Sequence, residues 1–282
     1  MKKFFKIAGI SLLILMVLLG GALGLFVYKV KNGFPVSYET DPPELTIPSE
    51  GRNVLLFSKT TGFRHEESIL AGIAKFEELA TKEGWFLYQT ESAGIFNVEQ
   101  LGRFDAVIFN NSTGRVLTDE QRIILKEYVE SGGKLIGIHG AGDDSHHWDW
   151  YEQSLLGAKF SHHPLNPQLQ EAEVKLDEGA EAALAEGLEN NWEHTDEWYI
   201  FFENPRVKGF DILYTINGDE IIPDGNLLWM KDKNWGMGED HPVAWSKRIG
   251  EGKTFYTSMG HHAEVWEQEP FIEMLINAVN WE

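Results

Sequence analysis

Histidine side chains follow several predicted strands of this chain, at the points where loops begin. An unperturbed imidazole has a pKa near 6.5, which suits proton transfer at neutral pH, and its free nitrogen is a common metal ligand. The polar residues at these strand ends are His65; Asn110 to Thr113; His139 with Asp143, Asp144, His146 and His147; and His261 with His262. Because the carboxyl ends of parallel strands meet at one edge of a sheet, we expect these loops to lie together.

The turn Gly137-Ile138-His139-Gly140-Ala141 has the pattern of a strand ending in a sharp elbow. In many α/β enzymes the residue at such an elbow is a Ser or Cys nucleophile flanked by small residues. Here the residue is His139, and the chain has no cysteine and no Gly-x-Ser-x-Gly motif. The lack of cysteine excludes thiolate catalysis, disulfides and Cys-ligated zinc. The elbow therefore predicts proton transfer or ligation by His139 rather than covalent catalysis.

A second candidate is the segment His194-Thr195-Asp196-Glu197-Trp198-Tyr199. Carboxylates hydrogen-bond sugar hydroxyls and aromatic rings stack on sugar faces, so this composition is typical of carbohydrate sites. Asp196 and Glu197 are predicted to orient hydroxyls or to act as the acid. A solvated acidic turn beside core aromatics is the alternative. The residues predicted to bind substrate are Asn110, Ser112, Thr113, Trp198 and Tyr199.

A divalent metal is an open alternative to metal-free acid–base chemistry. Imidazoles together with carboxylates suit Zn²⁺, Mn²⁺ or Fe²⁺. The sequence contains three adjacent histidine pairs but no His-Glu-x-x-His motif, and neighbouring side chains diverge, so no ligand set follows from spacing. The cofactor prediction is therefore none in particular, with a Zn, Mn or Fe ion as the alternative.

The elements that must position these residues alternate in the first half of the domain. Apolar runs predict strands over 53–57, 85–90, 106–109 and 134–138, and helical spacing predicts helices over 66–83 and 118–131. Continuous apolar strands separated by helices indicate a parallel sheet covered on both faces. We therefore expect a flavodoxin-like, doubly wound, mostly parallel α/β sheet.

The second half is less regular. Strands are expected over 170–176, 211–217 and 226–230, and a hairpin is expected over 243–258 around Gly250-Glu251-Gly252. Pro270 opens a closing helix that should run to residue 281.

The N-terminus predicts a membrane segment. Residues 1–6 are short and basic, and residues 7–28 form an uncharged run of 22 residues, enough to cross a hydrocarbon core of about 30 Å. Residues 29–50 read as a proline-rich linker, and residues 51–282 as the folded domain. We expect an anchor with the domain outside the cytoplasm, because the first lysine cluster favours an inside N-terminus. A cleaved secretory signal is the alternative.

The charge distribution argues against nucleic acid as a partner. The chain has 24 Lys and Arg, 44 Asp and Glu, and a net charge of −20. Residues 1–33 hold five lysines and no acidic residue, so the rest carries 19 basic and 44 acidic side chains, a net of −25. A body this acidic repels phosphate backbones.

Several motifs together resemble the ThuA-like, or trehalose utilisation, domain. The motifs are Gly62-Phe63-Arg64-His65, Gly133 to Ala141, His163-Pro164, Asp196-Glu197-x-Tyr199, His241-Pro242-Val243-Ala244-Trp245, and Tyr256 to His261. The resemblance covers residues 53–281 and implies a class I glutamine amidotransferase-like fold. True amidotransferases carry Cys at the elbow, so His139 at that position argues against glutaminase activity. The resemblance also implies a link to disaccharide breakdown by a route similar to 3-keto-sugar metabolism.

These observations lead to one leading hypothesis with two alternatives. The leading hypothesis is a membrane-tethered, extracytoplasmic enzyme acting on a disaccharide, glycoside or keto-sugar, as a hydrolase, lyase or isomerase. Its predicted catalytic residues are His139, His65, His261, Glu197 and Asp196. The alternatives are a non-catalytic carbohydrate-binding or scaffolding domain, and a metal-dependent hydrolase.

Overall fold

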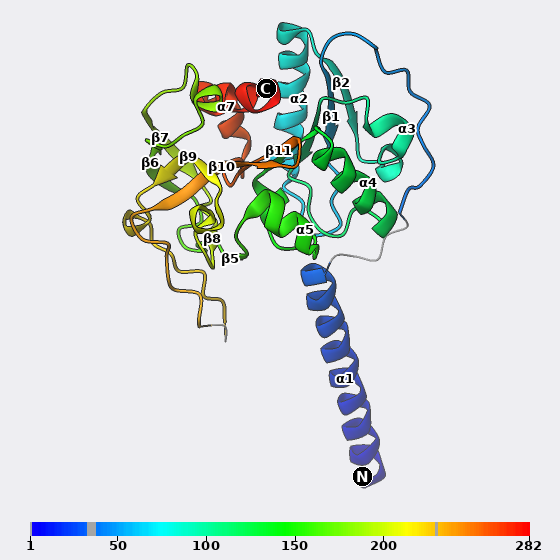
Figure 1. Ribbon diagram of the computed structural model, residues 1–282. Coiled ribbons are helices and arrows are strands. Elements are labelled where there is room, and N and C mark those ends of the chain that lie inside the picture. Colours follow the sequence, from blue (N-terminus) through cyan, green and yellow to red (C-terminus); the bar gives the residue numbers. More distant parts are fainter. Residues whose placement is uncertain (1, 33–37, 229–230) are drawn as a thin grey trace.

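The computed structural model describes residues 2–32, 38–228 and 231–282 and contains a nine-stranded mixed sheet (Figure 1). Five strands form its parallel half, in the order β2 (Phe86–Thr90), β1 (Asn53–Phe57), β3 (Ala106–Asn110), β4 (Lys134–Ile138) and β11 (Gly252–Thr257). Four more strands continue the sheet antiparallel, in the order β10 (His241–Ile249), β9 (Asp211–Ile216), β6 (Gln170–Leu176) and β7 (Asn191–Asp196).

The expected α/β fold is confirmed, but the sheet is mixed rather than mostly parallel. The reversal occurs at the β10–β11 hairpin, whose tight turn joins neighbouring strands that must run in opposite directions. β11 is parallel to β4, whereas each pair of neighbouring strands from β11 to β7 is antiparallel. A short second sheet pairs β5 (Phe160–His162) with β8 (Ile200–Phe201).

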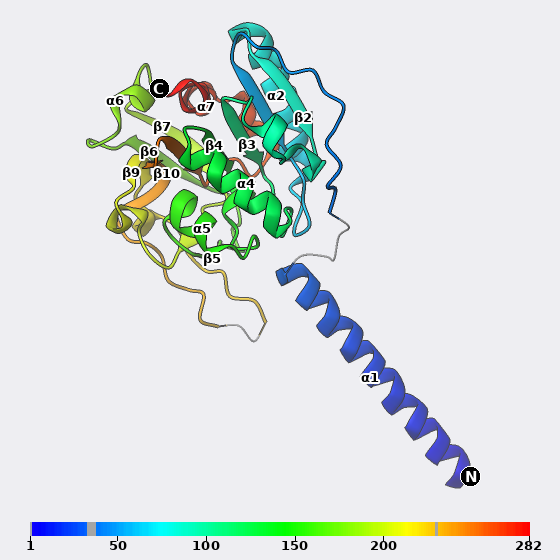
Figure 2. The same ribbon diagram turned by 45° about the vertical axis from the view of Figure 1, so that its right-hand side comes forward.

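Helices cover both faces of the sheet (Figures 1 and 2). Alternate residues of β1 point to opposite faces: Val54 joins the core under α2 (Glu66–Glu83) and α7 (Glu269–Asn280), whereas Leu55 joins the core under α4 (Asp119–Glu130). The shorter helices are α3 (Val98–Leu101), α5 (Asp149–Tyr151) and α6 (Ala182–Ala185). This two-faced layering is the one that the alternation of strands and helices predicted.

The strand predicted over 226–230 is wrong where the structure describes it. Residues 226–228 form no strand, and Trp229 and Met230 lie outside the described residues. Leu227 and Leu228 are 49% and 67% exposed. The apolar run therefore predicted a core strand, but its described leucines are exposed.

The linker does not run free of the domain over its described part. Ile47 is 2% exposed and belongs to the core under α4. The carbonyl of Pro43 accepts a hydrogen bond of 2.8 Å from Gln100, and that of Pro48 accepts one of 3.1 Å from Asn53. The proline-rich composition fits this extended packing, since proline offers no N–H and leaves its carbonyl to accept bonds.

The N-terminal helix α1 (Lys2–Asn32) stands apart from the domain (Figure 1). Its stretch Gly9–Lys29 is long and apolar enough to cross a membrane, and none of it is buried against the rest of the described chain. The apolar segment predicted over 7–28 is thus one exposed helix, in keeping with either an anchor or a signal sequence.

Candidate functional site

His139 occupies a sharp turn directly after β4. Its φ is +43°, a left-handed conformation that a non-glycine residue adopts only when its surroundings hold it there. The Tyr256 hydroxyl donates a 2.9 Å hydrogen bond to the carbonyl of His139. A side chain at Gly142 would overlap that same hydroxyl, so glycine is required three residues after His139. The predicted elbow is therefore present, with a buried imidazole at its tip.

The protonation of His139 follows from its position beside β11. Register pairing of Ile138 with Thr257 brings His139 next to Ser258. Its Nδ1 lies 2.6 Å from the carbonyl oxygen of Ser258, which can only accept, so Nδ1 carries the proton. The Nε2 lone pair is then free to bind a cation.

Three residues that are distant in sequence, His65, Glu197 and His261, surround that lone pair. His139 Nε2 lies 3.1 Å from His261 Nδ1 and 3.4 Å from Glu197 Oε2, and the last two atoms are 3.2 Å apart. The His65 ring centroid is 4.8 Å from that of His139 and 5.0 Å from that of His261. One donor atom from each of these four residues lies within 4.8 Å of the others. We call these residues the donor cluster.

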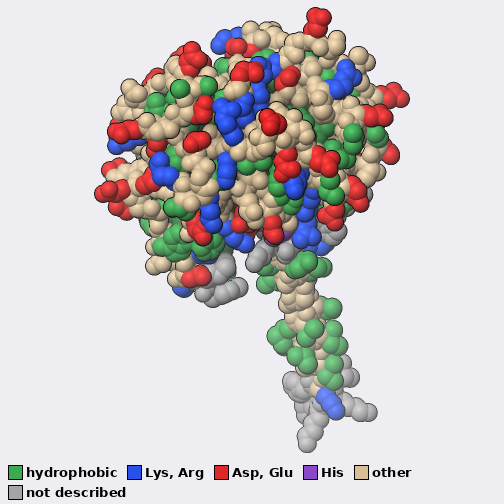
Figure 3. Space-filling view, in the orientation of Figure 1, with side chains coloured by type: hydrophobic (Ala, Val, Ile, Leu, Met, Phe, Trp, Pro, Cys, Tyr) green, Lys and Arg blue, Asp and Glu red, His purple; other side chains and the backbone are tan. Residues whose placement is uncertain are grey.

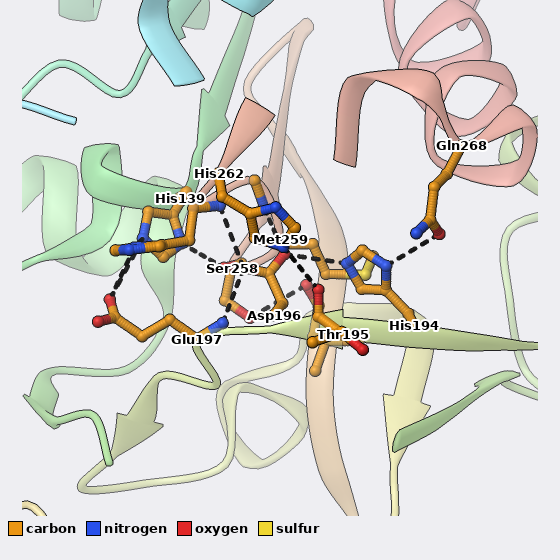
Figure 4. A network of polar contacts seen from close by, with 12 residues as sticks. His139, His194, Thr195, Asp196, Glu197, Ser258, Met259, His262 and Gln268 are labelled. Carbon is orange, nitrogen blue, oxygen red and sulfur yellow. Dashed lines mark hydrogen bonds and ion pairs between the residues drawn. The ribbon is translucent and has the colours of Figure 1, made fainter. Parts of the chain in front are cut away.

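Glu197 supplies the negative charge of the donor cluster. Burial raises the pKa of its carboxyl, but the neighbouring imidazoles of His139, His163 and His261 lower it more, well below its usual range. Its second oxygen, Oε1, lies 3.0 Å from His163 Nδ1 and 2.5 Å from Gln168 Nε2. These two contacts fix the carboxylate so that Oε2 faces His139 and His261. Figure 4 shows the Glu197 carboxylate beside His139.

His65 is held as a neutral base. Burial lowers its pKa, and the neighbouring His139 and His261 lower it further, to about 2. Its Nδ1 is buried without a hydrogen-bond partner. A buried polar atom left unpaired costs free energy, so this orphan points to a missing partner.

The donor cluster fits a divalent ion. Donors placed about 2.1 Å from one ion are roughly 3.0–3.4 Å apart in octahedral or tetrahedral geometry. The separations among His139 Nε2, His261 Nδ1 and Glu197 Oε2 are 3.1, 3.2 and 3.4 Å and fall in that range. Three imidazoles with one carboxylate suit Zn²⁺, Mn²⁺ or Fe²⁺. The candidate ligand set, which sequence spacing could not give, is thus His65, His139, Glu197 and His261.

Asp196 has no free oxygen for chemistry. Its Oδ2 accepts from His194 Nε2 at 2.9 Å and from the Gly260 amide at 2.7 Å. Its Oδ1 accepts from the amides of Glu197 at 2.8 Å and His261 at 3.1 Å. Burial raises its pKa, but the hydrogen bond and charge of His194 prevail and bring it to about 2. Figure 4 shows the chain of contacts continuing from His194 to Gln268.

Four predicted substrate-binding residues face inward instead. The hydroxyls of Ser112 and Thr113 donate to the carbonyls of Lys59 and Phe63, at 2.7 and 2.6 Å. Asn110 Nδ2 donates to the Ile69 carbonyl at 3.1 Å. Trp198 is fully buried and donates to the Gln170 carbonyl at 2.8 Å. These side chains therefore tie the strand-end loops together and offer a ligand no surface.

Tyr199 does reach the site, but as part of its wall. Its ring centroid lies 4.4 Å from that of His139 and 4.5 Å from that of Phe160, and the side chain is buried. The expected meeting of the strand-end histidines holds for His65, His139 and His261. His146 is not among them, since its Nε2 instead lies 2.9 Å from the carbonyl of Ser112.

The site includes three residues that residue-level reasoning did not single out. His163 and Gln168 support Glu197, and Phe63 is 63% exposed with its ring centroid 4.8 Å from that of His65. The sequence motifs contained Phe63 and His163 but did not indicate a role for either residue. Phe63 is the exposed ring that a sugar could stack on, a role that the sequence pattern had given to Trp198 and Tyr199.

Comparison with known proteins places this chain in a family. The family described as ThuA, trehalose utilisation, matches residues 53–282. The chain belongs to the ThuA family. This confirms the resemblance drawn from the motifs.

Solved structures share the ThuA fold at low identity. A ThuA-like protein from Bacteroides uniformis is 22% identical, with a TM-score of 0.67 over 88% of this chain and 95% of its own. A ThuA-like protein from Parabacteroides merdae is 16% identical, with a TM-score of 0.63 over 82% and 90%. No curated protein matches the chain.

Proposed function

We propose that this ThuA protein is a divalent-metal-dependent enzyme that acts on a disaccharide, glycoside or keto-sugar without a protein nucleophile. The observation that carries the proposal is the donor cluster, whose four ligand atoms converge from four separate loops within 4.8 Å. The sugar follows from the family's link to trehalose utilisation and from the exposed ring of Phe63 beside the cluster.

The protein's own groups divide the work. His65, His139, His261 and Glu197 hold the ion, and His163 with Gln168 keeps Glu197 turned toward it. A bound divalent ion polarises a sugar oxygen or lowers the pKa of a bound water. Phe63 orients the sugar ring against the cluster by stacking. Asp196 is a positioning residue, because its four hydrogen bonds hold the loop that carries His261.

The tether completes the proposal. The apolar stretch Gly9–Lys29 spans the membrane, and the acidic domain lies outside the cytoplasm. A cleaved signal would release the same domain as a soluble protein, and the mass of the mature chain distinguishes the two.

The test uses the full chain purified in detergent. We expect about one equivalent of Zn, Mn or Fe by elemental analysis, turnover of 3-keto-glycosides or plain disaccharides, and loss of turnover with a chelator. His139→Ala should abolish both metal and turnover. His262→Gln is the matched control, because the ring nitrogens of His262 contact Glu264 and the carbonyl of Thr195 instead.

Two results would overturn the enzyme proposal. Sugar binding with no metal and no turnover would favour a carbohydrate-binding domain. Turnover that survives both the chelator and His139→Ala would place the chemistry elsewhere.

A further inference from the structure

Three cations gather at the amino edge of the parallel strands, opposite the edge that carries the donor cluster. Lys134 and Lys253 are paired in register on the neighbouring strands β4 and β11, so their side chains leave the same face of the sheet. Arg52 directly precedes β1. β4 is five residues long, and at about 3.3 Å per residue the cations lie roughly 16 Å from the elbow at His139.

Lys134 is a buried cation without a carboxylate partner. The residue is 7% exposed, and its Nζ donates a 3.0 Å hydrogen bond to the carbonyl of Val279, near the end of α7. Arg52 Nη1 donates to the same carbonyl at 3.3 Å. Among the residues that the structure describes, no carboxylate oxygen lies within 4.0 Å of the amine of Lys134 or of Lys253. Capping of α7 therefore uses only one of the three N–H groups of the Lys134 ammonium.

This arrangement of charges is unfavourable without an anion. Neighbouring like charges repel each other, and burial deprives a cation of its hydration. Both effects act on Lys134: burial lowers its pKa, the charges of Arg52 and Lys253 lower it further, and the pKa falls to about 8. Asp105 and Glu282 raise this pKa but do not cancel the shift. The most buried of the three cations thus lacks a counter-ion.

The three cations line a cavity of about 500 Å³, a volume typical of small-molecule sites. The carboxylates of this cavity lie at its rim: Asp105 and Glu127 are exposed, and Glu282 pairs with Arg52 through a side chain that is 83% exposed. Part of the wall is apolar and is formed by Val98, Leu101, Phe104 and Ile124. Figure 3 shows Lys and Arg side chains gathered on the domain close to where Figure 1 marks the C-terminus.

We propose that this cavity binds a small molecule with a single carboxylate or phosphate group, whose oxygens accept hydrogen bonds from Lys134, Lys253 and Arg52. The apolar wall covers the uncharged body of the ligand. Asp105 and Glu127 at the rim repel any further negative charge, which disfavours polyanions. Binding there requires neither the metal nor the membrane tether, because the cavity and the donor cluster lie at opposite edges of the sheet.

Calorimetric titration of the full chain in detergent tests the cavity with glucuronate, glucose 6-phosphate and the uncharged methyl glucoside. At least one of the two anions should bind, and the one that binds identifies the preferred group. Lys134→Met and Lys253→Met each remove a charge and keep an unbranched side chain, and each should weaken anion binding about 10-fold or more. Lys126→Met is the matched control and should keep the wild-type affinity, since Lys126 lies on α4 near Glu130 and outside the cavity.

Proton uptake gives a second readout of Lys134. Glucuronate is already ionised at pH 8, where Lys134 is only partly protonated, so a bound carboxylate should draw protons onto this lysine. The measured heat should then vary with the ionisation enthalpy of the buffer, and Lys134→Met should remove that variation.

Three outcomes would overturn the anion site. The first is the absence of binding by either anion at up to about 10 mM. The second is anion binding that survives both lysine variants, which would place the anion elsewhere on the molecule. The third is methyl glucoside binding that Lys134→Met weakens as much as anion binding, which would mean that the cavity recognises hydroxyls rather than charge. None of these outcomes bears on the metal content or turnover of the donor cluster.

Discussion

At the scale of single residues, neighbouring carboxylates take opposite roles because of their hydrogen bonds. Asp196 has all its acceptor positions filled by His194 and three amides, so it fixes geometry. Glu197 keeps Oε2 for the cluster, since only Oε1 is bound by His163 and Gln168. Residue type alone does not separate these roles.

Glu197→Gln tests the ligand role of Glu197. The amide removes the negative charge among three imidazoles, and the loss of metal affinity should exceed the roughly 10–100-fold typical of losing a mere supporting partner. Turnover should fall with it. Glu193→Gln, an exposed position on β7, the strand that ends just before Glu197, should change neither. Metal content and turnover of the two variants decide the matter, and equal metal affinity in both would remove Glu197 from the ligand set.

Phe63→Ala tests the stacking surface. Loss of an aromatic contact of about 0.5–1.5 kcal/mol corresponds to a rise in KM of roughly 2–12-fold. Metal content should not change, and the free energy of unfolding should move by no more than about 0.5 kcal/mol, because the side chain is exposed. Phe202→Ala, which removes an exposed ring packed on Trp235, is the control. An unchanged KM in Phe63→Ala would refute the stacking role.

At the scale of elements, parallel register explains why the histidines meet. Pairing of β3 with β4 and of β4 with β11 aligns Asn110, Ile138 and Thr257 at one edge, and His139 and Ser258 follow directly. β7 joins from the far end of the sheet, with three strands between it and β11. The loop with Gly260 and His261 bridges that gap through Asp196.

Gly142→Ala tests the packing of the elbow. The new methyl group would overlap the Tyr256 hydroxyl, which holds the carbonyl of His139. Overpacking of this kind costs about 1–3 kcal/mol, and the displaced His139 should also weaken metal binding. Gly102→Ala meets no atom within 4 Å and should leave both unchanged or raise stability slightly. Denaturant unfolding compares the two, and a fully stable Gly142→Ala would contradict this account.

The strand-end elements also bury neutral histidines, which predicts loss of stability in acid. Burial lowers the pKa of His146 and of His241 to about 4. The unfolded chain takes up these protons near pH 6.5, so stability falls as pH drops from about 6.5 to about 4, by up to roughly 3 kcal/mol for each group. The free energy of unfolding of His241→Gln should therefore approach that of the wild type as pH falls from 7 to 4.5.

His262 provides a control of opposite sign. Burial lowers its pKa, but the carbonyl of Thr195 and the carboxylate of Glu264 raise it more. Its contribution is thus present below about pH 6.5 and is lost as pH rises through the folded pKa. The disadvantage of His262→Gln should shrink toward high pH. If the free energies of unfolding of His241→Gln and His262→Gln, each relative to wild type, changed with pH in the same direction, the opposite pKa shifts of the two histidines would be contradicted.

At the scale of the whole molecule, the domain and α1 are separate structures joined by a packed linker. Neither hydrophobic core contains a residue of α1, whereas Ile47 of the linker is part of one. A proline-rich linker was expected over residues 29–50. Its described part packs on the domain, where Glu39 forms an ion pair with Lys59 in the loop after β1.

Two fragments test this organisation. The fragment 38–282 should unfold within about 2 °C of the full chain, because no part of Gly9–Lys29 is buried. The fragment 51–282 should lose about 1.5–3 kcal/mol, because it lacks Ile47. Calorimetry of both fragments gives the answer, and equal stability would mean that the linker does not support the fold.

The sequence by itself determined the features that local patterns encode. Hydrophobic periodicity placed β1, β4 and α2 at their observed bounds, and the apolar N-terminal run became one exposed helix. Small residues around His139 predicted its elbow, and the motifs indicated the ThuA family.

Only the tertiary structure decided what depends on partners distant in the chain. It turned the second half of the sheet antiparallel, buried Trp198, and separated the roles of Asp196 and Glu197. Whether a carboxylate is available as a ligand or only positions a loop depends on which amides and imidazoles surround it. Those groups come from residues as far apart as His65, His139, Glu197 and His261, whose proximity no local pattern contains.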